Sequence, residues 1–294
     1  MSRWLIILFF ILSTPLNLAA ADSQRSPGQV AEVEVVPGVV MKFCWVPPGE
    51  AQLGSTQLER DTCIELKASE PEKLRLVTET EELRGKYQSS GFWMSKFPVT
   101  QGEWSAVMGK NPSVFLPDHA AVKQAAISDT SRFPVDNISW EDCQQFLKLL
   151  NGKPAPAALG SGKFALPHED QFEYACRGGK GNQQPYYFGM EHNGTLANSN
   201  GEHMYGTTTK GPYLGRPSVV GSYEKAAPHP WGLCDMHGNM FQWCENKYST
   251  ANDNRVVRAG SWSSGCRGAR SACRTGRVPT DRSMYFGVRI AFVP

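Results

Sequence analysis

Glycine and proline limit what this chain can fold into more than any other feature of its sequence. The 294 residues include 28 Gly and 20 Pro. Glycine adopts backbone conformations that other residues avoid, and proline lacks a backbone donor, so both interrupt regular helices and strands. We therefore expect long ordered loops joined by short elements, and neither a helical bundle nor a parallel α/β sheet.

The composition fits one folded domain. Hydrophobic residues make up 40%, and 8 Trp, 9 Tyr and 14 Phe can fill a core, which argues against a disordered chain. The 30 basic and 28 acidic residues leave a formal net charge of +2. This near balance excludes a nucleic-acid binder that works through net charge alone. No internal repeat or linker divides the chain.

Residues 1–21 are predicted to be a cleaved signal peptide, because Arg3 precedes an apolar stretch at 4–12 and small residues follow at 19–21. The apolar stretch is shorter than the roughly 20 residues that span a bilayer, and no later segment is long and apolar enough. A retained N-terminal anchor is the alternative. We expect a secreted or periplasmic protein with a loose N-terminal segment at 22–38 and a single domain at 39–294.

Eight cysteines are an even number in a chain expected to reach an oxidising compartment, so several are expected to form disulfides. The sequence cannot choose among the pairings. None lies in a CxxC motif, which argues against a zinc ribbon or a thioredoxin-type redox pair. The eight are Cys44, Cys63, Cys143, Cys176, Cys234, Cys244, Cys266 and Cys273.

Three helices are predicted from their capping residues. Thr100 begins a helix that ends at Gly109, and Ser139 begins a second helix with an apolar stripe. His168 begins a third, and we interpret it as a weak cap in preference to a catalytic base. Elsewhere, residues 30–46 alternate enough for one or two strands, whereas the charged segment 59–84 is predicted to be a solvated loop or insertion.

A series of short motifs then runs through the chain. They are MKFCWVPPG at 41–49, LGS at 53–55, FWMSKFPVTQGEW at 92–104, FPV at 133–135, SWED at 139–142, LP at 166–167, FEYACRGG at 172–179, WGLCDMHGNM at 231–240, RAGSW at 258–262, RSA at 270–272 and FGVR at 286–289. In this order they resemble the sulfatase-modifying-factor family, whose best-known members are the formylglycine-generating enzymes.

The resemblance implies a single α+β domain, rich in loops and related to the C-type lectin fold. It also implies bound calcium and a surface groove for partner polypeptides or other ligands. Active enzymes of the family bind copper(I) through two cysteines five positions apart and use oxygen to convert a substrate cysteine to formylglycine.

Copper(I) chemistry of this kind needs two soft thiolates that converge on one ion. The positions that match the family's cysteine pair are Ser264 and Ala269, and neither supplies a thiolate. Cys266 and Cys273 lie nearby but are seven positions apart. They are the candidates for a displaced copper site; a disulfide or two buried thiols are the alternatives.

The resemblance places one calcium site in the loop at 235–242, and a turn that only packs side chains is the alternative. A tight loop with oxygen ligands suits a hard cation such as calcium. By position, the ligands are Asp235, Gly238, Met240 and Gln242. A second site would begin at Asn198 and Ser199, with its distal ligands unplaced.

The segment 255–289 holds eight Arg, no Lys and one acid, Asp281. Arginine can bind carbonyls within an irregular core or an anionic ligand. We expect most of these arginines, including Arg270, Arg274 and Arg289, to hold loops together. The candidates for exposure beside the groove are Arg267, Arg277 and Arg282.

Two functions remain open. In the first, the chain is an exported binding or accessory protein without catalysis that holds a polypeptide or glycan in its groove. In the second, it is a copper- and oxygen-dependent oxidoreductase that oxidises a cysteine of a target protein, such as a sulfatase, at a displaced copper site. The absence of thiols at 264 and 269 favours the first.

Overall fold

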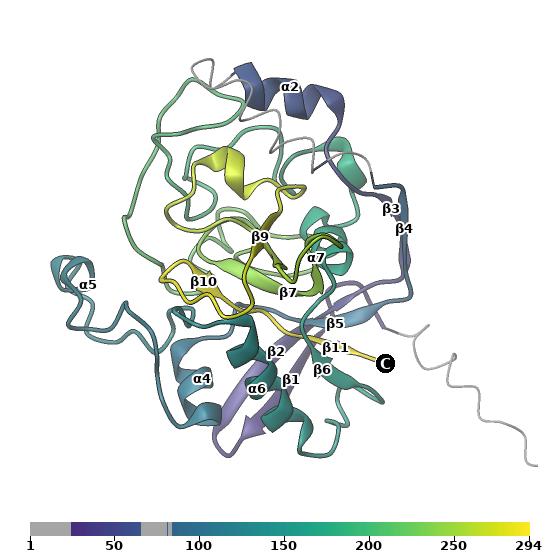
Figure 1. Ribbon diagram of the computed structural model, residues 1–294, viewed down its shortest axis with the longest axis vertical. Helices are drawn as coiled ribbons and strands as arrows, with labels where there is room; N and C mark the ends of the chain where they lie inside the picture. Colours follow the sequence, from purple (N-terminus) through teal and green to yellow (C-terminus); the bar gives the residue numbers. More distant parts are fainter. Residues whose placement is uncertain (1–24, 66–80, 82–83) are drawn as a thin grey trace, which may run out of the picture.

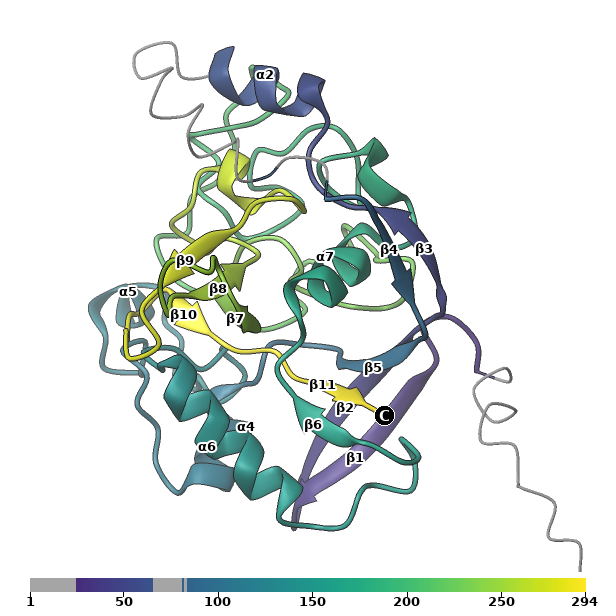
Figure 2. The ribbon, with the colours of Figure 1, turned by 45° about the vertical axis from the view of Figure 1, so that its right-hand side comes forward.

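A computed structural model describes residues 25–65, 81 and 84–294 (Figure 1). The signal peptide predicted at 1–21 lies outside the described residues. The chain folds around a five-stranded antiparallel sheet (Figure 2). In spatial order its strands are β1 (Val30–Val36), β2 (Val39–Val46), β5 (Phe92–Ser95), β11 (Ala291–Val293) and β6 (Lys163–Ala165).

The first strand shows how the sequence specifies this sheet. Its residues alternate in burial: Ala31, Val33 and Val35 face the core, and the residues between them are exposed. β1 pairs with β2 along most of its length. Residues 30–36 are therefore part of the folded sheet, and not of a loose segment that ends at residue 38 as predicted.

Two smaller sheets complete the β structure. One has the order β10 (Phe286–Gly287), β7 (Phe241–Lys247), β8 (Arg255–Arg258) and β9 (Thr275–Arg277), and the other pairs β3 (Gly49–Gln52) with β4 (Lys86–Ser89). Residues 184–240 are all described and form no helix or strand beyond single bridges. This long irregular stretch agrees with the expectation drawn from Gly and Pro.

The three predicted helices are confirmed, and so are their caps. Thr100 and Ser139 each form a capping box, and the N–H of Asp170 donates to the ring of His168. Gly109 ends the first helix in a left-handed conformation with φ of 72°. The helices are α4 (Gln101–Met108), α6 (Trp140–Asn151) and α7 (Glu169–Arg177).

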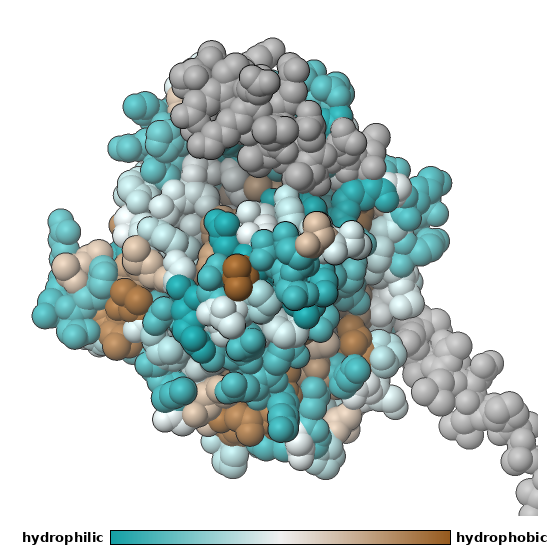
Figure 3. Space-filling view, in the orientation of Figure 1, coloured by the Kyte–Doolittle hydropathy of each residue, from teal (hydrophilic) through white to brown (hydrophobic). Residues whose placement is uncertain are grey.

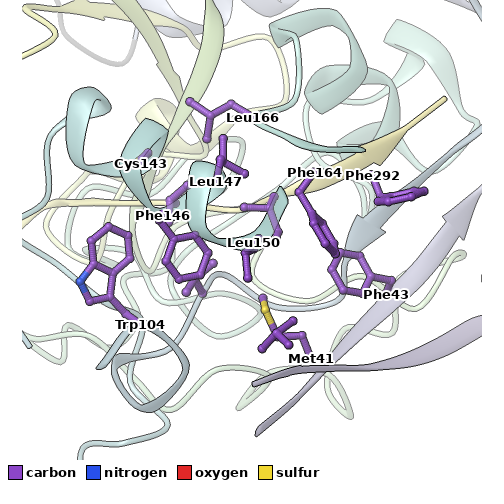
Figure 4. Close-up of a cluster of buried hydrophobic side chains, with 14 of the residues drawn as sticks. Met41, Phe43, Trp104, Cys143, Phe146, Leu147, Leu150, Phe164, Leu166 and Phe292 are labelled. Carbon is purple, nitrogen blue, oxygen red and sulfur yellow. The ribbon is translucent and has the colours of Figure 1, made fainter. Parts of the chain in front are cut away.

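The main core lies between α4, α6 and the five-stranded sheet (Figure 4). Phe146 of α6 stacks on Trp104 of α4, with ring centroids 4.9 Å apart. Phe164 of β6 lies against Phe43 and Phe292, with centroid distances of 5.8 and 5.2 Å. The apolar stripe of α6 thus meets strands from the beginning, middle and end of the chain.

The prediction of a solvated loop at 59–84 is wrong for part of that segment. Glu59 and Glu81 are 5% and 1% exposed. Both accept from Arg270, at 2.7 and 2.8 Å. Their partner is about 200 positions away along the chain, so no local pattern reveals it. Four short helical elements were also not predicted: α2 (Gln57–Glu65), α5 (Ala120–Gln124), η1 (Gly181–Gln183) and η2 (Cys266–Ala269).

The expected disulfides are not seen. All eight cysteines lie in the described residues, and each is a free thiol. Seven of them are buried, where cysteine packs as a small hydrophobic side chain. Of the described helices, none is long and apolar enough to cross a membrane.

Candidate functional site

A pocket of about 530 Å³ lies between two loops that are far apart in the sequence. It combines a carboxylate, an imidazole, a guanidinium and a hydroxyl with the backbone of two glycines. We take it as the candidate site because it contains position 264, one of the two family copper positions. Its lining residues are Glu202, His203, Met204, Ser264, Gly265, Arg267 and Gly268.

Backbone hydrogen bonds hold the two loops together. The N–H of Asn200 donates to the carbonyl of Ser264 at 2.8 Å, and the N–H of Cys266 donates to the carbonyl of His203 at 2.9 Å. A Cβ at Gly265 would lie 2.9 Å from the Cβ of His203. Glycine at this position therefore allows the loops to approach closely enough to form the pocket wall.

The two copper positions differ in their surroundings. Ser264 lines the pocket, and its hydroxyl accepts the N–H of Ser261 at 3.0 Å. Ala269 is fully buried, and its carbonyl accepts from Nδ1 of His237 at 2.7 Å. Nε2 of that ring accepts the N–H of Tyr187 at 3.2 Å. Burial lowers the pKa of His237 to about 3, so this ring is a neutral structural bridge.

The structure places neither nearby cysteine on the lining of the pocket. Cys266 is fully buried in a cluster with Cys63, Tyr186 and Tyr205, and Cys273 is partly buried. Burial raises the pKa of both Cys266 and Cys273 to about 12, which keeps them protonated at neutral pH. Because neither cysteine lines the pocket, the two sulfurs do not converge on a copper ion there.

The first predicted calcium loop leads into β7, and Asp235, Gly238 and Gln242 already use their oxygens in hydrogen bonds within the protein. Gln242 donates from Nε2 to the carbonyl of Asp235 at 3.0 Å, and its Oε1 accepts from Nε of Arg289 at 2.8 Å. The carbonyl of Gly238 accepts the N–H of Met240 at 2.8 Å. The loop is closed by hydrogen bonds within the protein, and its residues do not fit a bound calcium ion.

At the second predicted calcium position, Asn198 and Ser199 are both 1% exposed. Asn198 donates from Nδ2 to the carbonyl of Arg216 and to Oδ1 of Asn239, which leaves its own Oδ1 buried without a partner. Oγ of Ser199 is also buried without one. Two neutral oxygens fall short of the carboxylates typical of calcium sites. The described part of the chain has no cluster of three His, Cys, Asp or Glu suited to a metal.

The three candidate groove arginines lie in different places. Arg267 lines the pocket. Arg282 forms a two-pronged ion pair with Asp142, at 2.7 and 2.9 Å, beside the start of α6. Arg277 is on β9, 5.7 Å from the centre of the Phe286 ring. The pocket lining includes neither Arg277 nor Arg282.

Other arginines hold the irregular half of the chain together, as predicted. Glu173 of α7 is fully buried between Arg177 and Arg258, at 2.7 and 2.5 Å. Arg274 binds Glu169 at 2.7 Å. Together with the two ion pairs of Arg270 and the bonds from Arg289 to carbonyls, these contacts connect loops that have no regular secondary structure.

The lining residues Gly265 and Gly268 were not predicted, and neither were three from the other loop, namely Glu202, His203 and Met204. The residues at 202–204 belong to no motif of the resemblance, and nothing in their local sequence marks them. They reach the pocket only because Asn200 pairs with Gly265. A contact between residues more than sixty positions apart could have been found from co-variation in an alignment of homologues, but not from one sequence.

Residues 30–293 match the family described as Sulfatase-modifying factor enzyme 1-like domain. The chain belongs to this family. The resemblance that the short motifs showed is therefore confirmed across nearly the whole described domain.

Curated relatives of this sulfatase-modifying-factor domain differ in their names. The chain is 28% identical over 223 residues to "Inactive C-alpha-formylglycine-generating enzyme 2" of Bos taurus, covering 72% of this chain and 64% of the relative. It is 27% identical over 200 residues to "Formylglycine-generating enzyme" of Thermomonospora curvata, covering 58% and 59%. It is 24% identical to "Chaperone protein LppX" of Paenibacillus barcinonensis, covering 59% and 70%. The chain thus spans less than two thirds of the bovine and bacterial formylglycine-type relatives.

Solved structures support the fold. The chain matches "Treponema denticola variable protein 1" with a TM-score of 0.66 and 20% identity, covering 90% of this chain and 99% of the other. It matches PvdO from Pseudomonas aeruginosa with a TM-score of 0.62 and 19% identity, covering 91% and 99%. The predicted fold, a loop-rich α+β domain related to the C-type lectin fold, is confirmed.

Proposed function

We propose that this sulfatase-modifying-factor domain is a binding or accessory protein that holds a polypeptide or glycan in the pocket and does not oxidise it. The observation that carries the proposal is the pair Ser264 and Ala269 at the family's copper positions. A serine hydroxyl and a buried alanine methyl group cannot bind copper(I) as two thiolates do.

The chemistry of the pocket supports a polar ligand. Glu202, His203 and Arg267 offer both acceptors and donors, and Ser264 adds a hydroxyl. The face shown in Figure 3 carries mostly hydrophilic residues, with hydrophobic ones in separate spots. Hydroxyls of a glycan, or amides and charged side chains of a peptide, match such a lining better than an apolar ligand does.

The names of two relatives agree with a role without catalysis. One is called inactive and another is called a chaperone. For this chain we propose an exported polypeptide or a glycan as the partner, with a sulfatase as one candidate. We also propose that the protein is secreted or periplasmic after removal of residues 1–21. N-terminal sequencing of the protein from its native host tests this removal, and an intact Met1 would contradict it.

Ligand binding can be tested with a glycan array and a displayed peptide library. We expect a reproducible class of hits that Arg267→Ala weakens at least tenfold. Arg277→Ala is the matched control, because that arginine is exposed and lies outside the pocket lining. Equal loss in both variants, or no hits at all, would count against the pocket as the binding site.

Copper(I) titration after reduction tests the absence of oxidase chemistry. We expect no tight stoichiometric binding by the unaltered protein. Tight binding that Cys266→Ser or Cys273→Ser abolishes would instead support the alternative, a formylglycine-generating oxidoreductase with a displaced copper site.

A further inference from the structure

The loop at 235–242 contains an amide whose orientation is fixed by its neighbours. Nε of Arg289 can only donate, and it lies 2.8 Å from Oε1 of Gln242. The carbonyl of Asp235 can only accept, and it lies 3.0 Å from Nε2 of the same amide. The amide oxygen therefore faces a guanidinium, and the amide nitrogen joins the end of the loop to its beginning.

Arg289 makes this connection rigid. It is fully buried and also donates to the carbonyls of Ser95, Lys96 and Cys234. The guanidinium is planar, so its bonds fix the relative positions of the groups around it. One side chain thus ties the 235–242 loop to the end of β5 and to the segment before β11.

The carboxylate of Asp235 is also satisfied without a metal. Its Oδ2 accepts the N–H of Gly221 at 2.7 Å, and its Oδ1 faces Nδ2 of Asn239 at 3.4 Å. A second acid near the loop, Glu224, pairs with Lys96 at 2.7 Å.

Calcium would have to displace these contacts. Of the four charged side chains named here, only Arg289 is fully buried; Asp235 and Lys96 are partly exposed, and Glu224 is exposed. The side-chain oxygens of Asp235 and Gln242 already accept from protein donors, so calcium binding would cost those hydrogen bonds.

We propose that Gln242 and Arg289 close the 235–242 loop in place of calcium, and that residue 242 decides whether the loop binds the ion. Gln242→Glu removes the nitrogen that donates to Asp235 and adds a negative charge at the same position. The loop then loses its internal connection and gains an oxygen ligand of the kind that calcium prefers.

Calcium titration calorimetry and thermal unfolding in calcium or EGTA test this inference on the purified protein. We expect the unaltered protein to bind no calcium at this loop and to keep the same Tm in both buffers. Gln242→Glu should bind one calcium per chain and unfold several degrees higher in saturating calcium than in EGTA. The control is Gln171→Glu, the same chemical change at a cap where the side-chain oxygen still accepts an N–H.

Two results would overturn the inference. In the first, the unaltered protein binds one calcium and its Tm falls in EGTA, and Gln242→Ala removes both effects. The other is a folded Gln242→Glu variant without calcium affinity. If that variant does not fold, the double variant Asp235→Asn with Gln242→Glu keeps the charge count and serves in its place; folding without calcium affinity again overturns the inference.

Discussion

Asn151, the last residue of α6, protects the outer edge of the five-stranded sheet. Its Oδ1 accepts the N–H of Phe164 at 2.9 Å, and its Nδ2 donates to the carbonyl of the same residue at 2.8 Å. The side-chain amide thus takes the hydrogen bonds that a further strand would make with β6. An edge satisfied in this way cannot pair with another chain.

Asn151→Ala should lower the free energy of unfolding by about 1–3 kcal/mol, because it leaves a donor and an acceptor of Phe164 without their partner. Urea unfolding measures the loss, and light scattering measures any association through the freed edge. Gln144→Ala on the same helix is the control, since its side chain makes an exposed bond to Glu245. An equal loss of unfolding free energy in both variants would show that the bonds of Asn151 to Phe164 contribute no more than an exposed hydrogen bond.

The close packing of Gly265 against His203 can also be tested by a single substitution. Gly265→Ala would place a methyl group 2.9 Å from the Cβ of His203, which cannot rotate away. We expect the two pocket loops to separate, seen as a lower Tm and faster proteolysis near residues 202–204. Gly268→Ala provides the comparison, because its Cβ would lie 3.5 Å from that of Ser264, an ordinary contact. Equal proteolysis of both variants would argue against the tight packing.

At the scale of elements, ion pairs as well as packing fix the first residue of α7. Glu169 is 1% exposed and bonds to Arg274 and Arg84, each at 2.7 Å. Burial opposes its ionisation, but the charges of Arg258, Arg274 and Arg84 outweigh burial and lower its pKa from 4.5 to about 2. The ionised form is therefore favoured in the folded state.

The stability that Glu169 contributes should be complete above pH 4.5, its ordinary pKa, and should disappear as the pH falls towards about 2. Glu169→Gln should be less stable at neutral pH and should show a shallower loss between those two values. Urea unfolding at a series of pH values measures both. Glu32→Gln, at an exposed pair with Lys42, should leave the slope unchanged; a similar change there would contradict the assignment.

The elements that the sequence alone predicts are those with local signals. The caps at Thr100, Ser139 and His168 act within three residues, so they can be recognised without the fold. Helix α2 has a similar local signal that the sequence analysis missed, because Oγ1 of Thr56 accepts the N–H of Glu59 at 3.2 Å. The burial of Glu59, however, depends on Arg270, which lies far along the chain. The calcium loop shows the same limit, because the role of Gln242 depends on Arg289.

At the scale of the whole molecule, the order of the strands is the feature that sequence patterns could not predict. The β11 strand lies between β5 and β6, although nearly 200 residues separate it from β5. The pocket likewise depends on loops brought together across the chain. The family resemblance identified the fold class, whereas the lining at Glu202 and His203 required the structure.

Deletion of residues 291–294 should prevent stable folding, because it removes the strand between β5 and β6 and the buried ring of Phe292. Circular dichroism and limited proteolysis measure the outcome. Deletion of Pro294 alone leaves the strand intact and should have little effect. A compact, protease-resistant product of the longer deletion would contradict this account.

The interior position of β11 also affects how the protein can be made. While a ribosome is still adding residues, β5 and β6 have no partner between them, so the nascent chain cannot complete its main sheet. A product that ends before residue 291 is therefore a substrate for proteases rather than a slightly shortened protein. An exported precursor of this chain would likewise stay open to threading through a translocation channel until residues 291–293 have been added.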